Sequence, residues 1–233
     1  MSRSAVRFRA LAPQRKKPES ELPFSGFFVF SLQRGRGMNV RDFRQPEHLV
    51  SEPFLQRWSP RALTGEPITE DELNGLFEAA KWAPSAFNNQ PWRFLYARRG
   101  SPEWDVFFDL LVEGNKAWAK NAGALILLVS KRTLDHNGQP SRTHSFDTGA
   151  AWMSLALEAS LRGLAAHAMA GFNANKAQQV LGVPEDFAIE VMIAVGRQGS
   201  PEILPPDLRE RERPNTRKSV SEIAREGVWK DWR

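Results

Sequence analysis

The stretch RWSPRAL, residues 57–63, places two arginines and a serine at alternate positions. Pro60 disfavours helical geometry at the residue before it, so Ser59 is expected to be extended, and alternate side chains of an extended segment project to one side. Arg57, Ser59 and Arg61 are therefore predicted to converge on one target. Two guanidinium groups and a hydroxyl suit an anion or a carbonyl edge. A solvated basic turn is the alternative interpretation of these residues taken alone.

A second informative stretch is KWAPSAFNNQPWRF, residues 81–94. A helical pattern ends at a proline, small and amide residues follow, and a second proline leads directly into aromatic and β-prone residues. The two prolines restrict the shape of the loop at low entropic cost, and the small Ser85 and Ala86 allow a flat ligand to approach closely. The loop either connects two elements or forms a wall against such a ligand. Phe87 is ambiguous, because a large aromatic side chain in this loop could border a substrate.

The elements that must position these residues follow from capping signals and periodicity. Thr69 to Glu72 is a capping box, and apolar residues at helical spacing follow it. The segment 146–161 is apolar almost all round, so most of its surface must be covered, and a second subunit is a natural partner. Together the patterns predict an α+β domain with one central sheet and helices packed about it. The predicted helices are 70–82, 101–114, 146–161 and a short one ending near Gly182, and the predicted strands are 92–98, 123–130, 166–172 and 187–197.

Length and composition restrict the class of protein. The chain has 233 residues, of which 41% are hydrophobic, enough to bury the core of one domain with an appendage. It has no cysteine, which excludes thiol catalysis, disulfides and thiolate metal sites. The four histidines lack metal-ligand spacing, so no metal site is expected. No glycine-rich dinucleotide motif or P-loop follows a predicted strand.

The formal net charge of +5 comes from the first 37 residues. They contain eight Lys or Arg and two acids, a net charge of +6, so the rest of the chain sums to −1. A basic nucleic-acid-binding face on residues 38–233 is therefore not indicated. Residues 1–37 lack a periodic pattern and contain several prolines and glycines, which predicts a disordered basic extension. An organelle-targeting segment and an artificial extension ahead of Met38 are the open alternatives.

Five stretches taken together resemble the nitroreductase family of FMN-dependent oxidoreductases. In chain order they are RWSPR, AAKWAPSAFNNQPWRF, EGNKAWAKNAGALILL, AMAGF and RPNTRKSVSEI. The loop in the second stretch is the most specific motif, and the resemblance covers about residues 50–222. It implies a domain over residues 38–233 with a central mixed or antiparallel sheet flanked by helices. It also implies an intertwined homodimer with FMN sites at the subunit interface.

The resemblance implies a role for each matching residue. In the family, the first stretch contacts the pyrimidine edge and phosphate of FMN, and the proline-serine loop reaches the flavin from the other subunit. An asparagine lies near the polar edge of the flavin, an Ala-Gly pair brings backbone close to N5, and a C-terminal basic residue binds phosphate. The matching residues are Arg57, Ser59, Arg61, Pro84, Ser85, Ala86, Asn88, Asn115, Ala170, Gly171 and Arg217.

Physical chemistry supports several of these roles. Reduced flavin carries negative charge near N1 and the C2 carbonyl, and Arg57 or Arg61 would stabilise that charge. Arg217 offers a permanently charged fork for phosphate. Glycine at position 171 leaves room for the backbone to approach N5.

Three positions depart from the family pattern. Ala170 stands where an acidic or polar residue is common, so contact with N5 must come from backbone. Trp152 replaces a polar residue in the expected interface helix. Asn215 stands where some members carry a second phosphate-binding lysine, and Lys218 or an arginine of residues 1–37 would have to compensate.

The expected activity is hydride transfer by a ping-pong mechanism. NAD(P)H reduces flavin N5 and leaves, and an electron-poor acceptor such as a nitroaromatic or a quinone then takes the electrons. No side chain needs to be a catalytic acid, because the cofactor supplies the chemistry. The alternatives within the fold are a reductive dehalogenase, a flavin-destroying enzyme or a peptide-type dehydrogenase, with residues 131–143 as a cover. A nucleic-acid-binding protein with a basic arm is a distant alternative. A cytoplasmic location is expected, and the sequence favours neither NADH nor NADPH.

Overall fold

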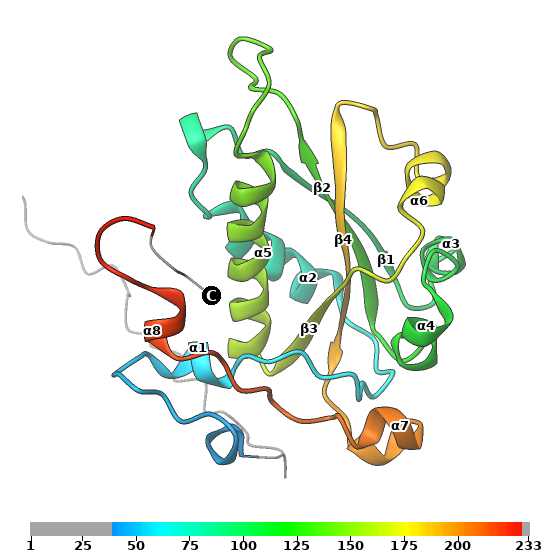
Figure 1. The fold of residues 1–233 in the computed structure, drawn as a ribbon. Coiled ribbons are helices and arrows are strands. Elements are labelled where there is room, and N and C mark those ends of the chain that lie inside the picture. The colour runs from blue at the N-terminus through cyan, green and yellow to red at the C-terminus, as the bar shows by residue number, and fades with distance from the viewer. Residues whose placement is uncertain (1–38, 230–233) are drawn as a thin grey trace, which may run out of the picture. The chain divides into compact units, whose positions relative to one another are not determined.

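The computed structural model describes residues 39–229, whose helices pack around one sheet (Figure 1). Within this range the sheet has four strands in the order β1-β2-β4-β3, and every neighbouring pair is antiparallel. The α+β class and the central antiparallel sheet are thus confirmed. The strands are β1 (Trp92–Arg98), β2 (Ala124–Lys131), β3 (Leu164–Met169) and β4 (Phe187–Arg197). The helices are α1 (Glu52–Gln56), α2 (Glu70–Lys81), α3 (Trp104–Phe108), α4 (Glu113–Ala119), α5 (His144–Leu161), α6 (Ala174–Val180), α7 (Pro206–Arg209) and α8 (Val220–Ile223), with 3-10 turns at Val40–Asp42, Ala86–Asn88 and Pro201–Ile203.

Helices cover both faces of the sheet. On one face, Leu76 of α2 and Leu155 of α5 lie in a buried cluster with Ile126 of β2. On the other face, Trp118 of α4 lies in a second cluster with Leu127 of β2. Successive side chains of a strand point to opposite faces. The central strand β2 is therefore apolar along its length, as the continuous apolar run in the sequence predicts.

Most predicted boundaries agree with the structure to within two residues. β1 and β4 span the predicted residues. The capping box before α2 is present, since Thr69 Oγ1 accepts from Glu72 N at 3.1 Å and Thr69 N donates to Glu72 Oε2 at 2.9 Å. The helix ends at Lys81, before Pro84 is reached. Local signals were sufficient for these elements.

One predicted helix is wrong. The segment 101–114 forms the short α3 and the start of a separate α4. Between the two helices, Leu111 pairs with Phe172 in an isolated antiparallel bridge. Gly114 consequently lies in the first turn of α4 and does not end a helix. A long-range backbone pairing has overridden the local helical pattern.

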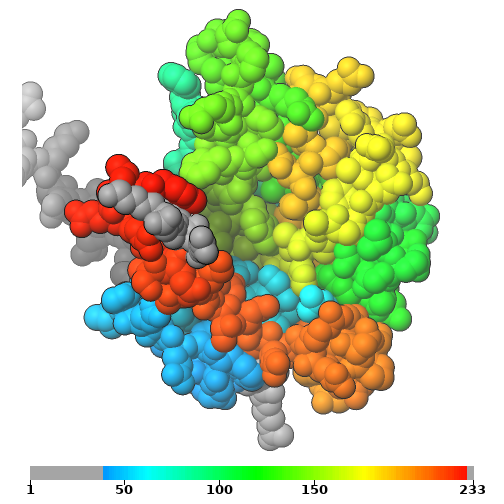
Figure 2. All heavy atoms as spheres, in the orientation of Figure 1, coloured from blue at the N-terminus to red at the C-terminus, as the bar shows by residue number. Residues whose placement is uncertain are grey.

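The last part of the described chain returns to its first part. We call residues 210–219 the C-terminal arm. After α7 the arm runs back past α1 in Figure 1, and in Figure 2 its orange to red atoms lie against the blue atoms of the first described residues. Val220 N, just after the arm, donates to Glu47 Oε2 at 3.0 Å. No helix within residues 39–229 is long and apolar enough to cross a membrane. The extension predicted at 1–37 lies outside the described residues, and the domain division stays a prediction.

Candidate functional site

Arg57 follows α1 directly, at the start of the extended segment that the sequence predicts. Its backbone has φ −68° and ψ 118°, and its Nη1 lies 3.4 Å from Ser59 Oγ. Its Nε is buried without a hydrogen-bond partner. Burial, and then the charge of Arg217, lower the pKa of Arg57. A buried N–H without an acceptor costs free energy, so this guanidinium is suited to receive an acceptor from a ligand.

Two further arginines bring positive charge to Arg57. Arg217 is an exposed residue of the C-terminal arm, and its Nη1 donates to Thr216 O at 2.9 Å. Arg44 is buried; burial lowers its pKa, and the charges of Arg217 and Arg57 lower it further. Within residues 39–229, none of the three arginines pairs with a carboxylate. Three neighbouring cations without an acid indicate a site for an anion.

Arg61, the third residue of the predicted motif, faces a carboxylate. Glu212 of the C-terminal arm is buried and accepts from the backbone N–H groups of Arg61 at 2.7 Å and Ala62 at 2.8 Å. Its Oε2 lies 4.0 Å from Arg61 Nη1. The structure therefore brings Arg57 and Ser59 together and directs Arg61 toward Glu212. Sequence reasoning missed Glu212, because no local pattern links residues that lie 151 positions apart.

His167 of β3 packs against the same segment. Its Nδ1 lies 3.1 Å from Pro60 O, and its ring lies against Trp118 with 4.6 Å between ring centroids. Burial is the main cause that lowers the pKa of His167 to about 4, although its hydrogen bond to Pro60 opposes the shift. His167 is neutral at pH 7, and because a carbonyl can only accept, its Nδ1 carries the proton.

We expect acid to destabilise the fold through His167. An unfolded histidine takes up a proton near pH 6.5, whereas the folded one does so only near pH 4. Its contribution to stability is therefore complete above about pH 6.5 and is lost as the pH falls toward 4. His167→Phe removes the titration and keeps a ring beside Trp118. Between pH 7 and pH 5, the unfolding free energy measured with urea should fall more for the wild type, by roughly 2 kcal/mol. Equal losses in both proteins would contradict this role.

Asn115 and Gly171 lie together just beyond the end of β3. The strand expected at 166–172 ends at Met169, so Ala170 and Gly171 belong to the turn that follows. Asn115 Nδ2 donates to Gly171 O at 2.9 Å. A Cβ on Gly171 would lie 2.7 Å from Asn115 Nδ2 and 3.0 Å from Val112 Cγ2. A side chain at position 171 would therefore displace the Asn115 amide at the start of α4.

Gly171→Ala is expected to destabilise the protein by about 1–2 kcal/mol, because the methyl group displaces the Asn115 amide from its hydrogen bond. Gly114→Ala is the matched control. A Cβ on Gly114 meets nothing within 4 Å, and alanine in a helix is favoured over glycine by up to about 1 kcal/mol. Asn115→Ala introduced together with Gly171→Ala should remove most of the clash. The free energy of unfolding of each variant is measured by chemical denaturation. If the double variant loses as much stability as the two single variants together, this explanation is contradicted.

The proline-serine loop is held at the start of α5. Ala86 N donates to Oδ2 of the buried Asp147 at 3.1 Å, and Ser85 Oγ accepts from Gln90 N at 3.0 Å. Three loop residues have a φ of 47° to 55°, in the left-handed region that residues other than glycine rarely adopt. These residues are Phe87, Asn88 and Gln90. Backbone in this region is costly and tends to occur at functional sites, where the surrounding contacts maintain it.

The hairpin 131–143 lies against this loop. Asn89 connects them, since its Nδ2 donates to Thr133 O at 3.2 Å and its Oδ1 accepts from Asp135 N at 2.8 Å. Phe87 is 80% exposed, and its ring centroid lies 5.2 Å from that of His136. The sequence predicted residues 131–143 to be a mobile cover or a surface loop. In the structure this hairpin is hydrogen-bonded to the proline-serine loop. Pro84 and Asn88 are exposed as well.

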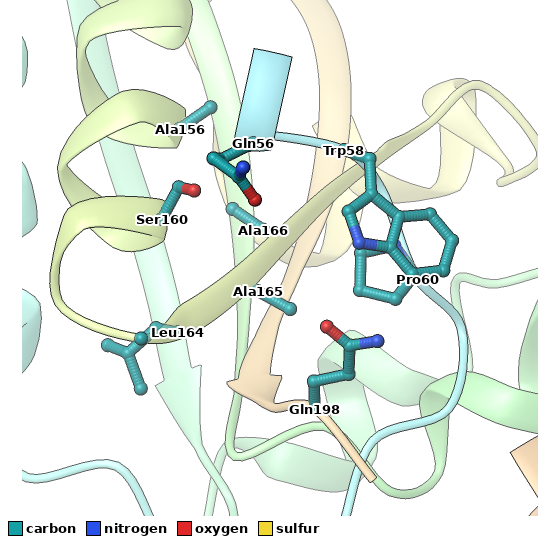
Figure 3. Close-up of a pocket in the computed structure, with 10 residues that line it drawn as sticks. Gln56, Trp58, Pro60, Ala156, Ser160, Leu164, Ala165, Ala166 and Gln198 are labelled. Carbon is teal, nitrogen blue, oxygen red and sulfur yellow. The ribbon is translucent and has the colours of Figure 1, made fainter. Parts of the chain in front are cut away.

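Two groups of predicted site residues stand at opposite ends of α5. Asp147 in the first turn holds the loop. Ser160 in the last turn lines, with Gln56 and Pro60, a hollow of about 110 Å³ beside the arginine segment (Figure 3). Between Asp147 and Ser160 the helix rises about 20 Å. The arginine group, at the Ser160 end, contains Arg57, Ser59, Arg61 and Arg217, and the loop group, at the Asp147 end, contains Pro84, Ser85, Ala86 and Asn88. Asn115, Ala170 and Gly171 lie beside one another beyond the last residue of β3. Within one chain, the arginine group and the loop group are separated by about 20 Å along α5.

Comparison with known proteins shows the family to which the chain is similar. The model of the "Nitroreductase family" matches residues 54–103 and 101–197. A solved structure described as an oxidoreductase containing FMN is 46% identical, with a TM-score of 0.78 over 80% of this chain and 96% of the other. The relative "Putative NAD(P)H nitroreductase MhqN" of Bacillus subtilis (strain 168) is 27% identical over 65% of this chain and 87% of its own length. A 15.4 kDa protein of Mycolicibacterium smegmatis is 32% identical over 59% of this chain and 97% of its own length.

The chain belongs to the nitroreductase family, since the family model covers well over half of its residues. The fold has the same architecture as a nitroreductase from Desulfovibrio desulfuricans determined in complex with FMN, at 24% identity and a TM-score of 0.60. The resemblance based on five short stretches is therefore confirmed.

Proposed function

We propose that this protein is an FMN-dependent oxidoreductase. It takes a hydride from NADH or NADPH and delivers it to an electron-poor acceptor, such as a nitroaromatic or a quinone, in a ping-pong reaction in the cytoplasm. The observation that carries the proposal is the set of three arginines that pair with no carboxylate of residues 39–229, in which Arg57 Nε is buried and unpartnered. This set fits the phosphate and the electron-rich edge of FMN. The 46% identical relative is described as containing FMN.

The chain's own residues bind and orient the cofactor. Bound FMN supplies a centre that accepts a hydride and passes it on. Arg57 and Arg217 provide the positive charge that holds the anionic cofactor and favours its reduced form. Neutral His167 and buried Glu212 keep the arginine segment in place through their contacts with its backbone. The turn at Ala170 and Gly171 would present its backbone to the flavin, and Asn115 holds this turn through its hydrogen bond to Gly171 O.

A second copy of the chain is required to complete the site. The arginine group and the loop group stand at opposite ends of α5, about 20 Å apart along the helix. If two copies of α5 pack antiparallel about a twofold axis, the loop of one chain approaches the arginines of the other. We therefore propose a homodimer with two FMN sites, each built from both subunits.

The outer face of α5 supports this pairing. Toward the sheet the helix buries a stripe that includes Ala151 and Leu155. On the opposite side, apolar residues recur at a spacing of three to four, which defines one face of a helix. The ends of this outer stripe are exposed, at 81% for Phe146 and 48% for Leu161. The stripe contains Phe146, Ala150, Met153, Leu157 and Leu161. Such a face is well suited to bury against its own copy.

Steady-state kinetics test the proposed reaction. Initial rates are measured without oxygen while NADPH or NADH and p-benzoquinone or nitrobenzene are varied together. Parallel double-reciprocal lines are expected, because the nicotinamide leaves before the acceptor binds. Converging lines would contradict the ping-pong order. Absence of NAD(P)H oxidation with every acceptor, in protein reconstituted with FMN, would contradict the reaction class.

A further inference from the structure

Arg44 is a buried arginine whose hydrogen bonds within the described part of the chain go to backbone carbonyls. Its Nη1 donates to Leu55 O at 2.7 Å and to Arg57 O at 2.8 Å, and its Nε donates to Asn215 O at 3.1 Å. The side chain is 8% exposed. Burying a charge without a carboxylate is costly. Three carbonyl acceptors offset part of this cost but leave the positive charge in place.

The three carbonyls belong to the two segments that carry the arginines of the anion site. Leu55 and Arg57 lie at the end of α1. Asn215 lies in the C-terminal arm, two residues before Arg217 and 171 positions from Arg44. Figure 1 shows these two segments running side by side below α5. Arg44 thus connects the backbone that presents Arg57 to the backbone that presents Arg217.

This connection acts against electrostatic repulsion. Arg217 lowers the pKa of both Arg44 and Arg57, which means that each guanidinium feels the positive charge of the arm. Left to repulsion alone, the arm would move away from α1. The hydrogen bond from Arg44 to Asn215 opposes this movement. An anion placed among the three cations would remove the repulsion.

We propose that Arg44 is a positioning residue that fixes the C-terminal arm beside α1, so that Arg57 and Arg217 together bind the phosphate of FMN. This inference rests on the proposed function and adds a residue to it.

Flavin titrations test this role, because riboflavin is FMN without the phosphate. Dissociation constants for FMN and riboflavin are measured by quenching of flavin fluorescence in the wild type, Arg44→Gln and Arg41→Gln. Arg41 is the matched control, since it lies three residues away and pairs with Glu52 on the surface. We expect Arg44→Gln to reduce the preference for FMN over riboflavin roughly 10- to 100-fold and to leave riboflavin affinity nearly unchanged. Arg41→Gln should keep the wild-type preference.

A double-mutant cycle separates positioning from bulk stability. If Arg44 acts by placing Arg217, then Arg44→Gln should have little further effect on the FMN preference once Arg217→Gln is present. Arg44→Lys keeps the charge but cannot present the planar fork that reaches three carbonyls. It should lose part of the preference, and it serves as the test if Arg44→Gln does not fold.

The possible outcomes are distinct. An Arg44 variant that keeps the wild-type FMN preference, or that loses FMN and riboflavin affinity equally, would overturn the inference and leave the proposed function intact. Fully additive effects of Arg44→Gln and Arg217→Gln would overturn it as well. A wild-type protein that binds neither flavin would contradict the proposed function, and this inference with it.

Discussion

Mixed dimers of two defective chains are expected to regain one FMN site. Arg57→Ala removes a partly buried guanidinium of the arginine group, and Ala86→Trp places a bulky ring in the loop group. Each homodimer should bind little FMN. In a mixed dimer, one site combines both defects, whereas the other combines the intact arginine of one chain with the intact loop of its partner. Co-expressed chains carrying different affinity tags should therefore hold about one FMN per two chains.

The design distinguishes sites built from two chains from sites built within one chain. If each chain formed its own site, every site in the mixed dimer would carry one of the two defects, and no flavin would be recovered. Flavin absorbance of the doubly purified protein is the measurement. Mixed dimers as empty as the two parent homodimers would contradict the proposed interface site.

Glu212→Ala is expected to have the largest effect on stability. The Glu212 carboxylate accepts from the backbone N–H groups of Arg61 and Ala62, and it is 2% exposed. Its loss leaves two buried donors without an acceptor and releases the C-terminal arm, at a cost of roughly 2–5 kcal/mol. The free energy of unfolding is measured by chemical denaturation.

Two variants control this prediction. Glu212→Gln keeps one oxygen that can accept from both N–H groups, and should cost about 1 kcal/mol. Glu210→Ala removes an exposed carboxylate two residues earlier in the arm and should change the stability by less than about 0.5 kcal/mol. A loss in Glu212→Ala no larger than that in Glu210→Ala would show that the carboxylate does not hold the segment.

Capping residues and hydrophobic patterns within a segment correctly predicted several helices and strands. The Thr69 and Glu72 capping box located α2, and the aromatic and β-prone residues of 92–98 located β1. They failed at 101–114, where the bridge from Leu111 to Phe172 splits the helix. A backbone pairing between positions that far apart leaves no trace in a helical pattern.

The candidate site was predictable only where residues lie in short stretches. Arg57 and Ser59 stand two apart, and the structure brings their side chains into contact. Glu212 and Arg44 act through backbone groups of segments at least ten residues away, so no spacing rule could find them. Asp147 left a weak signal, because a carboxylate among the apolar residues of a buried helix needs a partner. The structure supplies that partner as the N–H of Ala86.

The visible absorption spectrum of the purified protein tests the central claim most directly. The spectrum is recorded before and after incubation with FMN and removal of the excess, and NADPH or NADH is then added without oxygen. The account predicts a flavin spectrum at about one FMN per chain that bleaches when the nicotinamide is added. A colourless protein that cannot be reconstituted with FMN would contradict the account.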